Sequence, residues 1–126
     1  MKNLWISISF FILMIIGMLY ALNYLNTVCK EVEEKSVKLE ELINAENWEE
    51  ADKLSNDLYY SWIKKAKVMT VFVNHVEIDS LNNEILNLTQ YVKCKSKDDA
   101  LTCSHTIKFY SQNIADLQKL NISNIF

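Results

Sequence analysis

Residues 4–25 read LWISISFFILMIIGMLYALNYL and contain no charged side chain. A helix rises ~1.5 Å per residue, so this run of 22 residues is long enough to cross the ~30 Å hydrocarbon core of a bilayer. The run therefore predicts a membrane-spanning helix. This prediction places the protein at a lipid bilayer before any other feature is considered.

A cleaved signal peptide and a retained anchor both explain this run, because both begin with a positive charge such as that of Lys2. A signal-peptide core is usually about 7 to 15 residues long and ends at a small-x-small cleavage site. The present run is longer and lacks such a site, and a lipoprotein signal using Cys29 would require a small residue in place of Val28. We expect an uncleaved anchor over residues 1–27.

The orientation of the anchor is predicted from the charges that flank it. Lys30, Lys35 and Lys38 follow the anchor, so a count of basic residues does not by itself favour an external domain. Acidic residues at positions 31, 33 and 34 balance these lysines, and a signal anchor with a charged start commonly keeps its N-terminus in the cytoplasm. We expect the remaining domain to lie on the extracytoplasmic side of the cell membrane.

Residues 28–126 are predicted to form one domain of ordinary soluble composition. The net charge of the chain is −3, and all 13 basic residues are lysines. Arginine is the side chain that makes bidentate contacts with phosphate, so this composition argues against nucleic-acid binding.

Three helix starts are indicated by capping boxes, in which an Asn or Ser precedes an acidic residue by three positions. They are Asn47 with Glu50, Asn74 with Glu77, and Ser96 with Asp99. Together with the helix that continues from the anchor to about Asn44, they predict four helices. Short connections make neighbouring helices antiparallel, so the expected fold is all-α, an up-and-down helical bundle.

Each predicted helix carries an apolar stripe with steps of three or four residues. The first carries Leu25, Val28, Val32, Leu39, Leu42 and Ile43; the second, near residues 48–72, carries Trp48, Ala51, Leu54, Leu58, Trp62, Ala66, Met69 and Phe72. The third carries Ile78, Leu81, Ile85, Leu88 and Val92; the fourth carries Cys103, Ile107, Tyr110, Ile114, Leu117 and Leu120. The tail residues Ile122, Ile125 and Phe126 are expected to pack back onto this core.

A metal site is one interpretation of His75, Glu77 and Asp79, because His75 and Asp79 share a helix face and offer two ligands. The same residues form the capped first turn of a helix, where acidic side chains offset the positive helix end. The structural interpretation is favoured. Metal binding remains the alternative.

Cysteines and lysines each offer a second candidate feature. Cys94 and Cys103 flank the predicted turn between the last two helices and would permit a disulfide. Cys103 also lies on the apolar stripe, and the interpretation of Cys103 as a small buried residue without a disulfide is favoured.

Residues 64, 65 and 67 are lysines beside Trp62. A solvated helix face is favoured for them over contact with anionic lipid. Trp48 and Trp62 are expected to be core residues.

Several short motifs resemble domain of unknown function family 4363 when they are taken in order. They are residues 47–51 (NWEEA), Trp62 with its following lysines, residues 74–79 (NHVEID) and residues 124–126 (NIF). The resemblance implies a small bacterial protein with an N-terminal membrane helix and a helical domain, whose biochemical role is not established. It singles out Trp48, Trp62, His75, Glu77 and Asp79 as a candidate interaction or structural motif, and it assigns none of them to catalysis.

These features predict a non-enzymatic, single-pass membrane protein. Its bundle is expected to act as an interaction or structural module beside another envelope membrane protein, with the bilayer contacting residues 4–25. Neither a cofactor nor a small-molecule substrate is indicated. The alternative is an enzyme or sensor that binds a divalent metal through His75, Glu77 and Asp79.

Overall fold

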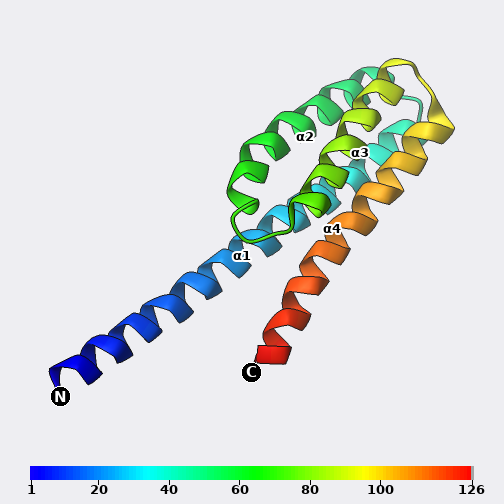
Figure 1. Cartoon of the computed structure of the whole chain (residues 1–126). Coiled ribbons are helices and arrows are strands. Elements are labelled where there is room, and N and C mark those ends of the chain that lie inside the picture. Colours follow the sequence, from blue (N-terminus) through cyan, green and yellow to red (C-terminus); the bar gives the residue numbers. More distant parts are fainter. Residues whose placement is uncertain (126) are drawn as a thin grey trace.

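The computed structural model describes the backbone of residues 1–125 and the side chains of residues 1–119. Four helices occupy this part of the chain, and it contains no strand: α1 (Lys2–Asn44), α2 (Trp48–Met69), α3 (His75–Lys93) and α4 (Lys97–Ile125) (Figure 1). The predicted all-α class and all three predicted helix starts are therefore confirmed. The second helix ends at Met69, three residues earlier than the stripe through Phe72 suggests.

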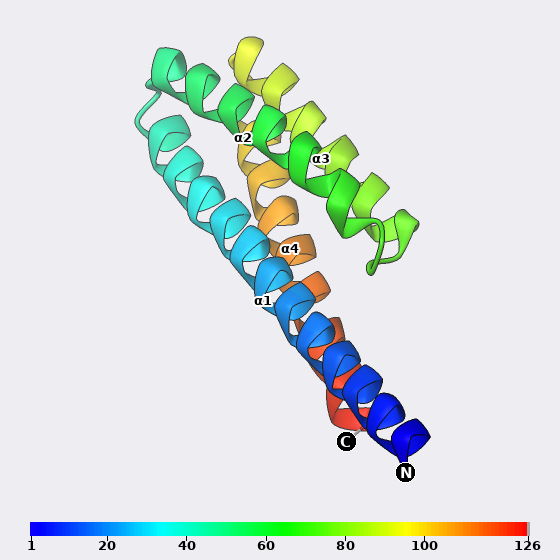
Figure 2. The ribbon, with the colours of Figure 1, turned by 90° about the vertical axis from the view of Figure 1, so that its left-hand side faces the viewer.

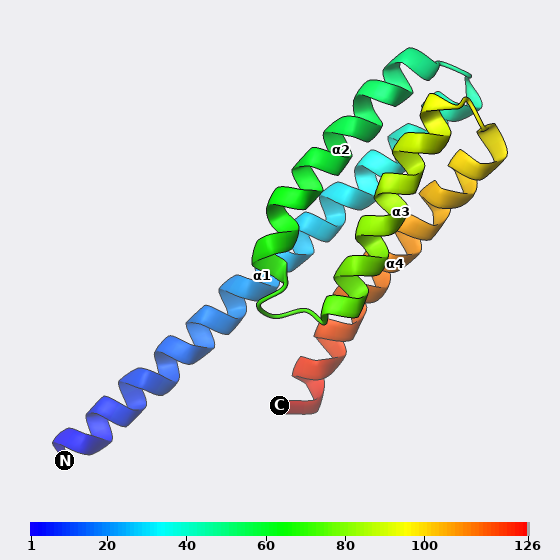
Figure 3. The same cartoon turned by 45° about the horizontal axis from the view of Figure 1, so that its top comes forward.

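The helices form an up-and-down bundle in which each helix packs on two neighbours. Helix α1 contacts α2 and α4, and α3 contacts the same two helices on the opposite side of the core (Figure 3). The contact between α1 and α4 is the most extensive. This arrangement confirms the predicted antiparallel bundle.

The core contains most of the predicted stripes of the first three helices, with Trp62 as its largest fully buried side chain. The exceptions, among them Trp48, which was expected in the core, are only partly buried and pack against it: Leu42, Trp48, Leu54 and Phe72. The indole Nε1 of Trp62 donates a hydrogen bond to Oδ1 of Asn82 on α3, so the polar edge of the ring is satisfied. The stripe predicted for α4 is partly wrong, because Leu117 is 41% exposed. Leu120 and the tail residues 122, 125 and 126 lie outside the described side chains.

Four serines are fully buried, although no predicted stripe included a serine. Ser36 and Ser104 face each other, because the hydroxyl of Ser104 donates to the backbone carbonyl of Ser36 at 2.9 Å. The hydroxyl of Ser36 donates to the carbonyl of Val32 within its own helix, at 2.8 Å. Each buried hydroxyl thus has a backbone acceptor, and the small side chains leave room for close helix packing. The full set is Ser36, Ser55, Ser104 and Ser111.

Two helix ends adopt a Schellman motif without glycine. At the end of α1 the amides of Glu46 and Asn47 donate to the carbonyls of Ile43 and Leu42, and the end of α3 repeats the pattern around Lys95. Glu46 and Lys95 therefore take positive φ angles of 56° and 54°, a conformation that costs a residue with a side chain more than glycine.

The predicted capping boxes form only in part. Asn74 caps α3, because its side chain accepts a hydrogen bond from the amide of Val76 at 3.0 Å. Asn47 occupies the same position before α2 but makes no side-chain cap bond; the prediction of a capping box there is wrong. Before α4, the hydroxyl of Ser96 donates to the carboxylate of Asp99 at 2.6 Å.

Helix α1 has two halves with opposite environments. Its first half projects beyond the connection between α2 and α3 (Figure 2), and its most apolar stretch of 18 residues contains no buried residue. Leu25 is its first buried residue, and Tyr24 packs against the core from the side. The second half supplies core residues as far as Ile43. One uninterrupted helix therefore carries both the apolar run and one quarter of the bundle.

Candidate functional site

The first half of α1 is the largest exposed apolar surface among the described residues. Its most apolar 18-residue window has a mean hydropathy of 2.3 and is 0% buried. By length and composition it can cross a membrane, although a signal sequence near an N-terminus has the same properties. The exposed large side chains include Trp5, Phe10, Phe11, Leu13, Met14 and Tyr20.

An ion-pair network joins α1 to α2 a few residues after Leu25, the first buried residue of α1. The carboxylate of Glu31 accepts hydrogen bonds from Lys65 and, at 3.2 Å, from Ser61, and it lies 3.0 Å from Nζ of Lys35. Lys35 also pairs with Asp57 at 2.9 Å. The hydrogen bond from Lys65 is the largest of the effects that lower the pKa of Glu31 to about 2, although burial opposes it. The network holds Glu31 ionised across the range in which most carboxylates titrate.

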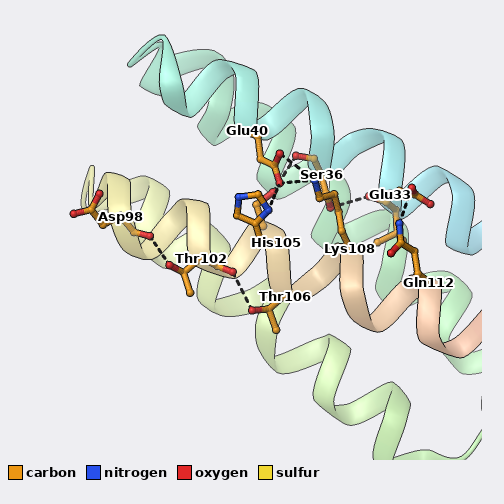
Figure 4. A network of polar contacts seen from close by, with 11 residues as sticks. Glu33, Ser36, Glu40, Asp98, Thr102, His105, Thr106, Lys108 and Gln112 are labelled. Atoms are coloured by element: carbon orange, nitrogen blue, oxygen red, sulfur yellow. Dashed lines mark hydrogen bonds and ion pairs between the residues drawn. The ribbon is translucent and has the colours of Figure 1, made fainter.

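A second polar network runs along the seam between α1 and α4 (Figure 4). Glu40 of α1 lies 3.0 Å from Nζ of Lys108 and 3.2 Å from Nδ1 of His105. Gln112 lies one turn after Lys108 on α4, and Glu33 lies two turns before Glu40 on α1. The side-chain amide of Gln112 donates a hydrogen bond to the carboxylate of Glu33 at 3.0 Å. Both networks tie neighbouring helices to α1, so they fix the position of the bundle on the helix that carries the apolar run.

The five residues singled out by sequence do not form one site. Trp48 begins α2 at the end of the bundle far from the apolar run, whereas Trp62 is buried near the middle of the same helix. His75, Glu77 and Asp79 lie in the first turns of α3, at the opposite end from Trp48.

The structure does not support a metal site at His75, Glu77 and Asp79. His75 and Asp79 are exposed, and Glu77 borders an open hollow beside Ile114 of α4, whereas Asp79 borders a different hollow beside Ala66 of α2. Positions 77 and 79 are two residues apart and therefore point to opposite sides of the helix. Within the described side chains, no three His, Cys, Asp or Glu residues are grouped so that they could hold a metal ion.

All three cysteines have free thiols, so the bridge considered between Cys94 and Cys103 is absent. Cys94 is exposed in the α3–α4 connection, whereas Cys103 is buried on the predicted stripe. Burial, with a smaller effect of the carboxylate of Glu84, raises the pKa of Cys103 to about 12. Cys29 lines an open groove of about 540 Å³ between α1 and α4, but burial also raises its pKa to about 12. Neither buried thiol is a nucleophile at neutral pH.

A family model described as Domain of unknown function (DUF4363) matches residues 19–125. The chain belongs to this family. Comparison with curated proteins and with solved structures found no match.

The DUF4363 match begins inside the apolar run and includes the whole bundle. It therefore covers Tyr24 and Leu25, which pack in or against the core, together with both ion-pair networks on α1. Residues 4–18, which contain no buried side chain, precede the matched region. In this family member the end of the apolar run is structurally part of the DUF4363 domain.

Sequence reasoning predicts the pair of Glu31 and Lys35, which are four residues apart on one helix, but it missed the contacts between helices in both networks and the buried serines. Ser36 and Ser104 do continue the three- and four-residue steps of their stripes, so spacing alone could have indicated their burial. Lys65 and Glu31 are 34 positions apart, and no local pattern indicates that they pair. For Lys65, only a solvated helix face and contact with anionic lipid are weighed from the sequence, not an ion pair between helices.

Proposed function

We propose that the chain is a single-pass membrane protein whose apolar helix stays attached and holds a non-enzymatic bundle at the extracytoplasmic face of the cell membrane. The bundle serves as an interaction or structural module beside another envelope membrane protein. The observation that carries this proposal is the continuity of α1 from Lys2 to Asn44, through the exposed apolar half and into the core.

The packing of Leu25 and Val28 supports retention of the helix. Leu25 is fully buried and Val28 is 2% exposed. A cleavage that released the bundle ahead of Cys29 would remove both side chains from the core. Deleting one such side chain from a core typically costs about 1–5 kcal/mol, which is a large share of the stability of a small domain. The bundle is therefore more stable when α1 is not cleaved.

The polar residues of the bundle support a role in binding rather than in catalysis. Glu31, Lys65, Glu40 and Lys108 are engaged in ion pairs between helices, and the hollows that border the described side chains are open to solvent. An active site usually requires a pocket with convergent reactive groups. A rigid bundle with an exposed outer surface suits recognition of another protein.

Labelling of Cys94 tests the location of the bundle. A membrane-impermeant maleimide should label the chain in intact cells, because Cys94 is exposed at the end of the bundle far from the apolar run. Cys29 and Cys103 should react slowly, so the Cys94→Ser variant is the matched control and should lose the label. Labelling that requires permeabilised cells would contradict an extracytoplasmic bundle.

Retention and partnership need two further measurements. The chain should remain in carbonate-washed membranes with residues 1–27 intact by mass spectrometry; a shorter chain in the medium would refute the anchor.

A photo-crosslinking residue placed at Tyr60, which is exposed on α2, should capture a specific membrane protein in native membranes. Recovery of monomer alone, from this position and from exposed Phe109 on α4, would count against an interaction module.

A further inference from the structure

The contacts between α1 and α2 show how far the bundle reaches along the apolar helix. Asp57 lies opposite Lys35, and Ser61 lies opposite Glu31. The two helices are antiparallel and share a rise of ~1.5 Å per residue, so the end of α2 at Met69 falls near the level of Asn23. The α2–α3 connection therefore lies level with the last part of the apolar run along the axis of α1, and Figure 2 shows it set to one side of that helix (Figures 1, 2 and 3).

A membrane-spanning α1 places this connection at the bilayer surface. A hydrocarbon core of ~30 Å needs about 20 helical residues, which carries the helix from Leu4 to about Asn23. No residue before Leu25 is buried, but Ala21, Leu22 and Tyr24 are partly covered, so the bundle already begins at the level of the last turn of this span. The end of the bundle must therefore overlap the headgroup layer.

The side chains at this end are suited to a lipid surface. Val71, at the tip of the connection, is 84% exposed, Val76 at the start of α3 is 68% exposed, and Val68 near the end of α2 is 49% exposed. Lys64 and Lys67 are exposed on the flank of the same end of α2, where their long side chains can reach lipid phosphates. Three exposed valines at one end of the bundle, level with the end of the apolar run, differ from the isolated surface residues that are common on soluble bundles.

We propose that the α2–α3 connection rests in the headgroup layer of the phospholipid bilayer that α1 crosses, with Val71 and Val76 in contact with lipid. The inference rests on the proposed membrane anchor. Its consequence is a second contact with the bilayer, which restricts the tilt of the bundle on α1. Asp79 and Glu77 lie near the same end, so apolar contact rather than net charge drives the association, and neutral phosphatidylcholine suffices.

Depth-dependent fluorescence quenching tests the proposal on the full chain in phosphatidylcholine vesicles. A nitrobenzoxadiazole dye is attached at position 71 in a Val71→Cys, Cys94→Ser variant and, for comparison, at the native Cys94. A third variant, Tyr60→Cys with Cys94→Ser, places the dye on an exposed face of α2 about 14 Å further from the membrane. A lipid that carries a nitroxide on its headgroup acts as the quencher.

The dye at position 71 should be quenched several-fold more strongly than the dye at positions 60 or 94, and its emission should shift to the blue. Equal quenching at all three positions, in chains that resist carbonate extraction, would overturn the lipid contact and leave the anchor intact. Loss of the chain from the vesicles on carbonate extraction would overturn the anchor and this inference together. Val71 is almost fully exposed, so its replacement leaves the core unchanged.

Discussion

Glu31 joins α1 to α2 and makes the stability of the bundle depend on pH. Its carboxylate accepts hydrogen bonds from Lys65 and Ser61 and pairs with Lys35. These contacts lower the pKa of Glu31 from 4.5 to about 2. Because the pKa is lower in the folded state, the ionised carboxylate stabilises the bundle above about pH 4.5, and this stabilisation is lost as the pH falls towards 2.

The size of the effect follows from the pKa change and the exposure of the side chain. A change from 4.5 to about 2 corresponds to at most about 3 kcal/mol in the free energy of unfolding. The side chain of Glu31 is 33% exposed, so water screens its ion pairs and we expect about 1–2 kcal/mol. Glu31→Gln should lower the free energy of unfolding by this amount at pH 7 and by much less near pH 2.5.

Urea unfolding of the full chain in detergent micelles, followed by circular dichroism at both pH values, measures this difference. Glu49→Gln is the control, because the side chain of Glu49 is 82% exposed and pairs with Lys53 of its own helix. We expect the control to change the free energy of unfolding by less than about 0.5 kcal/mol. An equal loss in Glu31→Gln at both pH values would show that the side chain acts through packing, and it would refute the electrostatic explanation.

Three further predictions are checked by the same unfolding measurement. Leu39→Ala should lower the free energy of unfolding by about 2–5 kcal/mol because Leu39 is fully buried; a loss under 1 kcal/mol would contradict its place in the core. Asn74→Ala should cost about 1 kcal/mol because its side chain caps α3, whereas Asn47→Ala should cost less because Asn47 makes no such bond; equal costs would contradict the observed caps. Lys95→Gly should stabilise the bundle by about 0.5–1 kcal/mol because Lys95 has a φ of 54°, whereas Lys93→Gly at the last residue of α3 should destabilise it by about 0.5 kcal/mol; a loss in both would show that the positive φ is not strained.

Helix number and helix starts could be predicted because their causes are local. Asn74 precedes His75 in sequence and caps the same helix in space, and the stripe from Ile78 to Val92 needs only the geometry of one helix to be recognised. Helix ends were less predictable. The stripe through Phe72 continued past the true end of α2, because apolar spacing does not show where the backbone turns.

The candidate site was predictable only in its apolar part. The exposed half of α1 follows from composition alone, whereas His75, Glu77 and Asp79 were grouped because they are close in sequence. On α3 they point in different directions, and Glu77 and Asp79 border different hollows. The contacts that hold the bundle to α1 come from Glu31 and Glu40 with lysines 34 and 68 positions away, and separations of this size leave no periodic signal.

By itself, the sequence determined an all-α chain with four amphipathic segments and one apolar run, because hydrophobic periodicity and helix caps act over a few residues. Tertiary structure decided that Leu25 belongs to the core, that Lys65 pairs with Glu31, and that the α2–α3 connection lies level with the end of the apolar run. These contacts depend on the axial register of each helix against its neighbours. That register is set by the packing of whole helix faces, and no short segment of the chain contains it.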